Sequence, residues 1–237
     1  MPVAVVTGGT KGLGRALGAA LARRGWDLVL GARSAEALRS TAAELGGRHG
    51  ARVVAVAGDV TDPSHREALV AAAGELGGLD LLVSNASALG AEPLVRLEEL
   101  PLEGLRRALE TNVVAALGLV QEALPLLRAS AAGAVVTVSS DAATEPYGTW
   151  GGYGASKAAL DQLAAVLGAE EPGLRVWAVD PGDMATDLYT AAVPDDTGPR
   201  PRPEDVAPAF VRLLELRPPG GRYTASALLD MGRRAGR

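Results

Sequence analysis

Thr7-Gly8-Gly9-Thr10-Lys11-Gly12-Leu13-Gly14 decides the fold, because it is a glycine-rich turn between a predicted strand and a predicted helix. Pro2 to Val6 is a Val-rich apolar run, and Arg15 to Arg24 carries apolar residues at helical spacing. Glycine at such a junction lets the backbone approach a pyrophosphate, and a helix N-terminus favours an anion. A tight turn also needs glycine for steric reasons alone. The spacing is a G-x-x-x-G-x-G variant of the dinucleotide fingerprint, with glycines at Gly8, Gly12 and Gly14.

Outward from this turn, predicted strands and helices alternate along the chain. Fully apolar strands that alternate with helices indicate a parallel sheet covered on both faces, and right-handed crossovers make it doubly wound. We therefore predict an α/β fold, a three-layer doubly wound parallel sheet (Rossmann fold) of about seven strands. No composition break divides the chain, so residues 1–237 are predicted to form a single oxidoreductase domain.

The element boundaries follow from periodicity, caps and breakers. Gly46-Gly47 is expected to end the second helix, and residues 183–203 are expected to be irregular. Further strands are predicted at about 28–30, 53–56, 79–83, 134–138, 176–179 and 222–229. Further helices are predicted at about 34–45, 62–76, 101–128, from 153 onward, and at 204–216.

The amino-acid composition limits which classes of function the protein is expected to have. The formal net charge of −5 argues against a nucleic-acid surface. The absence of cysteine excludes disulfides and thiolate chemistry. No basic, apolar leader is apparent at the N-terminus, and no uninterrupted apolar run reaches the ~18 residues of a membrane span. A cytoplasmic protein without a membrane or nucleic-acid partner is expected.

The end of the second strand, Gly31-Ala32-Arg33-Ser34, bears on cofactor choice. An acidic residue at this point would bind the ribose 2′-hydroxyl of NAD, whereas an arginine suits a 2′-phosphate. Lys11, in the glycine turn, could reach the same phosphate. The pair favours NADP(H), although Arg33 alone could be an exposed residue at a helix start.

Tyr153 and Lys157 lie four residues apart at the start of a predicted helix, so they share one face. A fixed cation beside a phenol favours the phenolate, and such a tyrosine can act as a general acid or base. A surface pair is the alternative interpretation. However, the 23 Lys and Arg residues include only two lysines, Lys11 and Lys157. We therefore expect Lys157 to occupy a site where the larger, planar arginine could not replace it.

The two asparagines are also informative. Asn85 follows the fourth strand, and Asn112 lies inside the predicted long helix, where its propensity is poor. There it could bond the backbone and bend or hydrate the helix, or mark a structural kink only. Ser139 and Ser140 end the fifth strand at the sheet edge where open α/β sheets bind ligands, although serine could simply end the strand.

In this order along the chain, the motifs resemble the short-chain dehydrogenase/reductase family over residues 2 to about 187. The resemblance implies that Tyr153 donates or accepts the proton and that Lys157 lowers the tyrosine pKa and holds the nicotinamide ribose. It also implies that Ser140, selected over Ser139 by the family's spacing to the tyrosine, orients the substrate oxygen. Asn112 is implied to keep a water in a proton relay.

The resemblance further implies a cofactor path from pyrophosphate to adenine, ribose and nicotinamide, and no metal. The predicted cofactor-binding residues are Gly8, Thr10, Lys11, Gly12, Leu13, Gly14, Arg33, Ser34, Asp59, Val60, Asn85, Ala86, Tyr153, Lys157, Pro181, Gly182 and Thr186.

The chain departs from the family pattern at three places. Ser84-Asn85-Ala86-Ser87 stands where Asn-Asn-Ala-Gly is common. The segment between Thr186 and Glu204 is short, which suggests an open or shallow substrate site. The C-terminal region lacks the usual Asp-Gly-Gly ending, which puts oligomer geometry there in doubt.

For four further side chains, the sequence either indicates no specific function or leaves two roles open. His49 and His65 have no partner spacing for a metal and are expected at the surface. Tyr147 and Trp150 lie between Ser140 and Tyr153, where they could wall a substrate pocket or only pack the loop.

The expected function is NADP(H)-dependent interconversion of a ketone or aldehyde and an alcohol, mainly as a carbonyl reductase on a small-molecule substrate. A catalytically silent NADP-binding sensor or scaffold of the same fold is the alternative. Epimerase or dehydratase chemistry on a nucleotide sugar is a third, but the short chain after Thr186 leaves little room for its substrate domain. A homo-oligomer, dimer or tetramer, is expected, with the Ala- and Leu-rich helices able to supply an interface or only to pack on the sheet.

Overall fold

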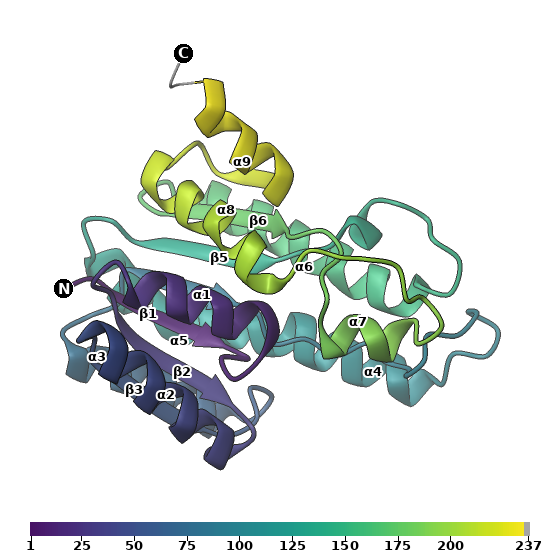
Figure 1. Ribbon diagram of the computed structural model, residues 1–237, viewed down its shortest axis with the longest axis horizontal. Helices are drawn as coiled ribbons and strands as arrows, with labels where there is room; N and C mark the ends of the chain where they lie inside the picture. The colour runs from purple at the N-terminus through teal and green to yellow at the C-terminus, as the bar shows by residue number, and fades with distance from the viewer. Residues whose placement is uncertain (235–237) are drawn as a thin grey trace.

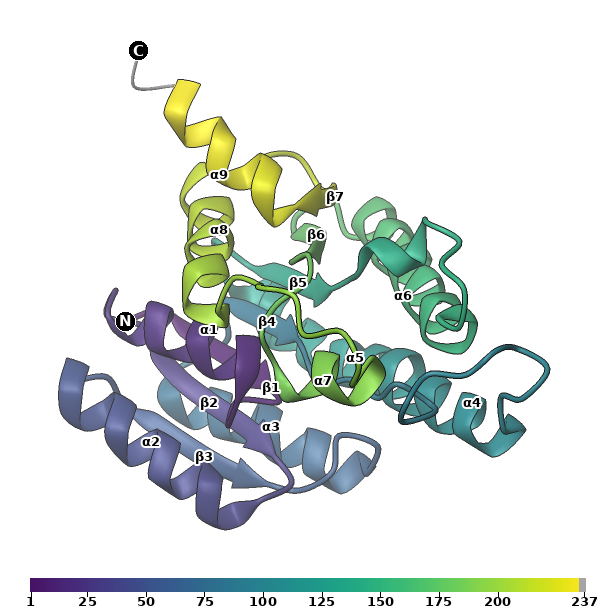
Figure 2. The same cartoon turned by 45° about the vertical axis from the view of Figure 1, so that its right-hand side comes forward.

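The computed structural model describes residues 1–234. All strands lie in one parallel sheet of order β3-β2-β1-β4-β5-β6-β7, which confirms the predicted doubly wound fold (Figures 1 and 2). The order reverses between β1 and β4, and ligands bind at such a switch point. The strands are β1 (Val3–Thr7), β2 (Asp27–Ala32), β3 (Val53–Ala57), β4 (Leu81–Ser84), β5 (Ala134–Val138), β6 (Arg175–Asp180) and β7 (Gly221–Thr224).

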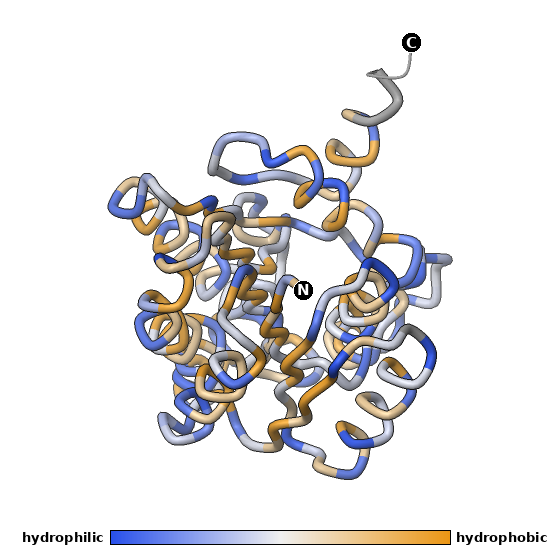
Figure 3. Tube along the Cα trace, turned by 90° about the vertical axis from the view of Figure 1, so that its left-hand side faces the viewer, coloured by the Kyte–Doolittle hydropathy of each residue, from blue (hydrophilic) through white to orange (hydrophobic). Residues whose placement is uncertain are grey.

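Helices cover both faces of the sheet. Successive residues of β1 point to opposite faces, so Val3 and Val5 join one buried cluster while Ala4 and Val6 join the other. In Figure 3 the hydrophobic strands run between helices whose outer turns are hydrophilic. The helices are α1 (Gly12–Ala22), α2 (Ala35–His49), α3 (Pro63–Leu76), α4 (Leu102–Leu109), α5 (Ala115–Ala129), α6 (Gly151–Glu170), α7 (Asp187–Ala192), α8 (Pro203–Leu216) and α9 (Ala225–Arg234).

Three predicted boundaries are wrong. Helix α2 continues through Gly46-Gly47 and ends at His49, because among these three glycines only Gly50, its C-cap, takes a left-handed conformation, with φ 68°. Residues 183–203 are not irregular throughout, since the Thr186 hydroxyl caps α7 by accepting from the Tyr189 N–H. The last strand stops at Thr224, whose hydroxyl accepts from the Ala227 N–H as α9 begins.

The predicted long helix is divided by a π-helical turn, η1 (Glu110–Val114), which contains Asn112. The helix is thus locally distorted at Asn112, where its regularity was expected to be disturbed. An 18-residue window within Leu102–Ala129 has a mean hydropathy of 1.2, so by length and composition alone this stretch could cross a membrane. One face of it packs in the core, because Leu119, Ala123 and Leu127 on α5 are buried with strand residues.

Candidate active site

A cavity of about 1220 Å³ lies along the carboxyl ends of the strands. It extends from the glycine turn and Arg33 at one end to Tyr153 at the other. Most sequence-predicted residues line it, namely Gly8, Thr10, Lys11, Gly12, Leu13, Arg33, Ser34, Asp59, Val60, Asn85, Ala86, Ser140, Tyr153, Lys157, Pro181, Gly182 and Thr186. Gly14 and Asn112 are not among the described lining residues; both are buried behind them.

The glycine turn forms a backbone cradle. Gly8 and Gly12 have φ of 68° and 53°, the left-handed region that favours glycine. A Cβ on Gly14 would lie 2.3 Å from the Gly8 carbonyl oxygen, so this close turn tolerates no side chain there. Within the described residues, no side chain caps the first turn of α1. Its N–H groups therefore face the cavity mouth, and the cradle fits a pyrophosphate.

Asn85 holds this cradle from behind. Its Nδ2 donates to the Thr7 carbonyl at 2.8 Å, and its backbone N–H donates to Thr7 Oγ1 at 3.0 Å. The Ala86 N–H donates to the same hydroxyl, also at 3.0 Å. These bonds join the end of β4 to the end of β1, so the predicted ribose-side residue also has a structural role.

At the end of β2, Arg33 is exposed on the cavity wall and Ser34 caps α2, its hydroxyl accepting from the Ala37 N–H at 3.3 Å. That Lys11 reaches the same phosphate as Arg33 stays a prediction. Lys11 Nζ contacts Asp187 on α7 at 2.8 Å. Both side chains of that ion pair are more than 70% exposed, so water screens it strongly.

His65 is not a surface residue, which corrects the sequence interpretation. It is 6% exposed and lines the cavity near Asp59. The absence of a side chain at Gly58 makes room for it, since a Cβ there would lie 2.5 Å from His65 Nδ1. Burial lowers the pKa of His65. The side chain of His49 lies outside the described residues.

At the other end of the cavity, Tyr153 and Lys157 occupy the first turns of α6 and are 5% and 2% exposed. The Lys157 ammonium lies 5.4 Å from the centre of the Tyr153 ring. Its Nζ donates to the Val138 carbonyl at 2.8 Å. Burial lowers the pKa of Lys157 to about 8, against a smaller raising effect of Asp161. The predicted shared face is therefore observed, and the pair is buried.

In this arrangement the pKa of Tyr153 is raised overall, and the effect of Lys157 on the phenol stays a prediction. Burial raises the pKa of the phenol well above its ordinary value, and the carboxylates of Asp180 and Asp141 raise it further. The Lys157 ammonium is directed to the strand carbonyl. The group that lowers the phenol pKa is the Ser87 hydroxyl, through a hydrogen bond.

Asn112 is 1% exposed, and its amide is fully engaged with protein groups. Its Oδ1 accepts from the Ala88 N–H at 2.8 Å and from the Ser87 hydroxyl at 3.2 Å. Its Nδ2 donates to the Ala88 carbonyl at 2.9 Å and to Ser156 Oγ at 2.8 Å. Ser156 in turn donates to the Tyr153 carbonyl at 2.7 Å. Asn112 thus joins the loop after β4 to the helix that carries Tyr153.

The two serines at the end of β5 differ in environment. Ser139 is 2% exposed and donates to Asp161 Oδ2 at 2.7 Å. Ser140 is partly exposed on the cavity wall, where its hydroxyl donates to Asp141 Oδ1 at 3.1 Å and accepts from the Ala142 N–H at 3.2 Å. Ser140 is therefore the serine whose hydroxyl is better placed for a substrate.

Apolar and aromatic side chains surround the Tyr153 end of the cavity. Trp150 lies 5.7 Å from Tyr153 and 6.3 Å from Tyr189 of α7, measured between ring centres. Trp150 lines the cavity, whereas Tyr147 is exposed and donates to Asp141 Oδ2. The Arg200 guanidinium stacks on Tyr189 at 3.9 Å. The short segment after Thr186 therefore forms an ordered wall of the cavity.

Sequence reasoning missed four residues with a part in this arrangement, namely Ser87, Ser156, Tyr189 and Arg222. Ser87 had a signal, since it replaces the glycine common at that position of the motif. Ser156 lies within the Tyr153 to Lys157 stretch and was passed over. Tyr189 and Arg222 carried no local signal, because tertiary contacts alone bring them to the site.

The chain matches the short chain dehydrogenase family over residues 2–197, and it belongs to that family of oxidoreductases. It is 37% identical over 223 residues to cis-4-hydroxycyclohexanecarboxylate dehydrogenase of Sinomonas cyclohexanicum, covering 89% of this chain and 88% of that protein. It is 39% identical over 189 residues to glycine betaine reductase ATRR of Emericella nidulans. That match covers 78% of this chain but only 15% of the relative.

A solved structure has nearly the same fold. A short chain dehydrogenase from Shigella flexneri, complexed with NADP, is similar with a TM-score of 0.88 and 28% sequence identity. The match covers 95% of this chain and 97% of that chain.

Proposed function

We propose that the protein is an NADPH-dependent carbonyl reductase that converts a ketone or aldehyde to an alcohol. The observation that carries the proposal is one continuous cavity, with a backbone cradle and Arg33 at one end and Ser140 beside Tyr153 and Lys157 at the other. Hydride transfer to a carbonyl requires a dinucleotide site and a proton donor that open into the same cavity.

The residues at the end of β2 support NADPH over NADH. Ala32 stands where an acidic side chain would bind a ribose 2′-hydroxyl, and the exposed Arg33 can pair with a 2′-phosphate. The Shigella flexneri relative contains NADP in its crystal structure. The cradle of Gly8, Gly12 and Gly14 would hold the pyrophosphate.

Bound NADPH supplies the hydride for the carbonyl carbon. Tyr153 gives its phenolic proton to the carbonyl oxygen, so one hydride and one proton convert C=O to CH–OH. Ser140 donates a hydrogen bond to the same oxygen and stabilises its developing negative charge. The Lys157 ammonium holds the nicotinamide ribose and stabilises the phenolate that remains.

Ser87 and Asn112 support Tyr153 from behind. The Ser87 hydroxyl interacts with the phenol and donates to Asn112 Oδ1. Asn112 keeps Ser87 and the loop after β4 in place, and solvent water that enters the cavity returns the proton to Tyr153.

The walls near Tyr153 favour a carbonyl compound with an apolar or aromatic body. The lining there includes Leu89, Trp150, Leu188, Tyr189 and Ala192. We further propose that the chain forms a single domain and acts as a cytoplasmic homo-oligomer.

NADPH oxidation by the full chain, screened against aromatic and aliphatic ketones and aldehydes, tests the proposal. Turnover with at least one class, faster with NADPH than with NADH, is the expected result. Tight NADPH binding without turnover of any compound would identify a silent cofactor-binding protein instead.

A further inference from the structure

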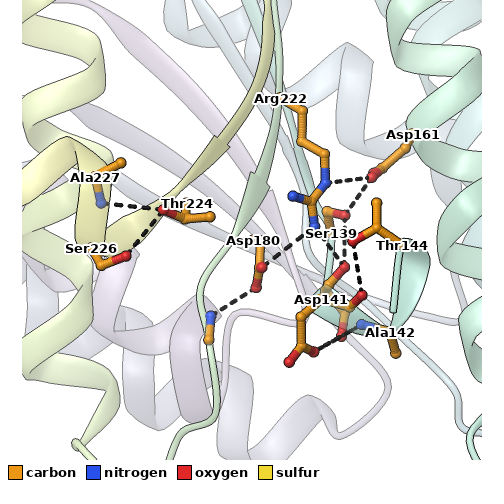
Figure 4. A network of polar contacts seen from close by, with 12 residues as sticks. Ser139, Asp141, Ala142, Thr144, Asp161, Asp180, Arg222, Thr224, Ser226 and Ala227 are labelled. Atoms are coloured by element: carbon orange, nitrogen blue, oxygen red, sulfur yellow. Dashed lines mark hydrogen bonds and ion pairs between the residues drawn. The ribbon is translucent and has the colours of Figure 1, made fainter. Parts of the chain in front are cut away.

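Arg222 on β7 lies across the carboxyl ends of the neighbouring strands. Its Nε donates to Asp161 Oδ2 on α6 at 3.1 Å. Its Nη2 donates to the Ser140 carbonyl at 2.9 Å and to Asp180 Oδ2 at 3.4 Å. Figure 4 shows the guanidinium between Asp161 and Asp180. One side chain therefore contacts α6 and the ends of β5 and β6.

Two of these contacts lead to residues that line the cavity after the adjacent strands β5 and β6. Ser140 carries the hydroxyl placed at the substrate oxygen. The second oxygen of Asp180, Oδ1, accepts from the Gly182 N–H at 2.9 Å, and Gly182 lines the cavity beside the nicotinamide position. Arg222 itself is absent from the described lining. It therefore acts on the reaction through its partners, and the contacts with Ser140 and with Asp180, which holds Gly182, are the most direct.

The network is mostly buried and places one guanidinium between two carboxylates. The side chains of Asp161 and Asp180 are 15% and 8% exposed, whereas that of Arg222 is 31% exposed. Asp161 also accepts from Ser139, which ties the residue before Ser140 to the same cluster. A buried ion pair contributes little net stability but imposes a fixed geometry.

We propose that Arg222 is a positioning residue that holds Ser140 and Gly182 in place relative to each other. The proposal rests on the proposed carbonyl reduction for its kinetic consequence. Its structural consequence, a fixed Gly182 amide, is independent of turnover.

The charges around Asp180 determine its pKa, and the Gly182 amide that it holds can report that pKa. Burial raises the pKa of Asp180 and Asp141 raises it further, while the Gly182 N–H and Arg222 lower it. The Tyr153 phenol on α6 also faces this carboxylate. Removing the guanidinium takes away a lowering effect, so Asp180 becomes protonated at higher pH than in the wild type.

The test compares Arg222→Met with Arg222→Lys and a matched control, Arg52→Met. Arg52 also joins a buried carboxylate and a carbonyl, those of Asp27 and Leu76, but at the amino end of the sheet. Arg222→Met is expected to lower kcat by roughly 10- to 100-fold, the scale of a misplaced reacting group. Arg222→Lys should recover part of kcat, and Arg52→Met should lower Tm without lowering kcat.

A pH titration of the Gly182 amide signal by NMR, in wild type and Arg222→Met, tests positioning without turnover. We expect a higher titration midpoint in the variant, abolished when Asp180→Asn is added. An unchanged midpoint, or equal kcat losses for Arg222→Met and Arg52→Met, would overturn the proposal. If the wild type reduces no carbonyl compound, the proposed function fails while the amide titration still decides the role of Arg222.

Discussion

The two lysines of the chain lie at opposite ends of one cavity and in opposite environments. Lys157 is 2% exposed and donates to the Val138 carbonyl, whereas the side chain of Lys11 is 72% exposed and pairs with Asp187. Burial lowers the pKa of Lys157 to about 8. Lys11 carries its charge in water.

This difference indicates that the Tyr153 end of the cavity carries the chemistry and that the Arg33 end recognises the cofactor. At the buried end, few water molecules screen a charge or a dipole, so each group has a large effect on a reacting atom. At the exposed end, water and salt weaken every ion pair. The Tyr153 end should therefore govern kcat, and the Arg33 end should govern KM for the cofactor with a clear salt dependence.

The largest effect is expected for Tyr153→Phe, which removes the proton donor and preserves the ring. A general acid contributes about 10²- to 10⁴-fold, so kcat should fall by roughly 10³-fold. NADPH binding, measured by fluorescence titration, should change by less than about twofold because the ring still packs against Trp150. Full activity in this variant would contradict the mechanism.

The same substitution at each lysine sharpens the comparison. Lys157→Met should lower kcat by roughly 10²-fold, because the phenolate loses its cation, whereas Lys11→Met should leave kcat unchanged. In the wild type, Lys157 is charged below its pKa of about 8 and neutral above it. The kcat/KM profile should therefore fall above about pH 8, and steady-state rates across pH would show this limb. Equal kcat losses in both variants would remove the distinction between the two ends.

A smaller effect is expected for Arg33→Ala. Loss of a charged partner for the 2′-phosphate should raise KM for NADPH about tenfold, with KM for NADH unchanged. In the wild type, the ratio of KM for NADH to KM for NADPH should shrink as salt increases, because salt weakens the exposed contact between Arg33 and the 2′-phosphate. Steady-state kinetics at low and high salt provide the measurement, with Arg39→Ala on α2 as a control. A parallel rise in both constants would mean that Arg33 does not read the phosphate.

The smallest effect is expected for Asp187→Asn, which releases Lys11 from its ion pair. If Lys11 can then turn toward the cofactor, KM for NADPH should fall by about twofold or less, the scale of an exposed pair. The double variant Asp187→Asn with Lys11→Met should cancel the gain. An increase in KM would show that the ion pair itself shapes the cavity.

Much of the fold followed from local pattern. Buried Val-rich strands, the glycine turn and the Ser34 cap have physical causes within a few residues, and most appear where predicted. The errors in the predicted boundaries lie where the conformation of neighbouring residues determines where a helix begins or ends. Gly46 and Gly47 stay helical because only Gly50 takes positive φ, and α7 forms because Thr186 caps it.

The candidate site divides in the same way. The sequence by itself determined the parallel α/β fold and the residue types that line the cavity, because strand periodicity, glycine turns and the Tyr153 to Lys157 spacing are local properties. Only the tertiary structure decided how those groups are charged and aimed. The raised pKa of Tyr153, the burial of His65 and the reach of Arg222 to Ser140 depend on contacts between distant segments. Electrostatic effects depend on depth and distance, and neither is encoded within a short stretch of chain.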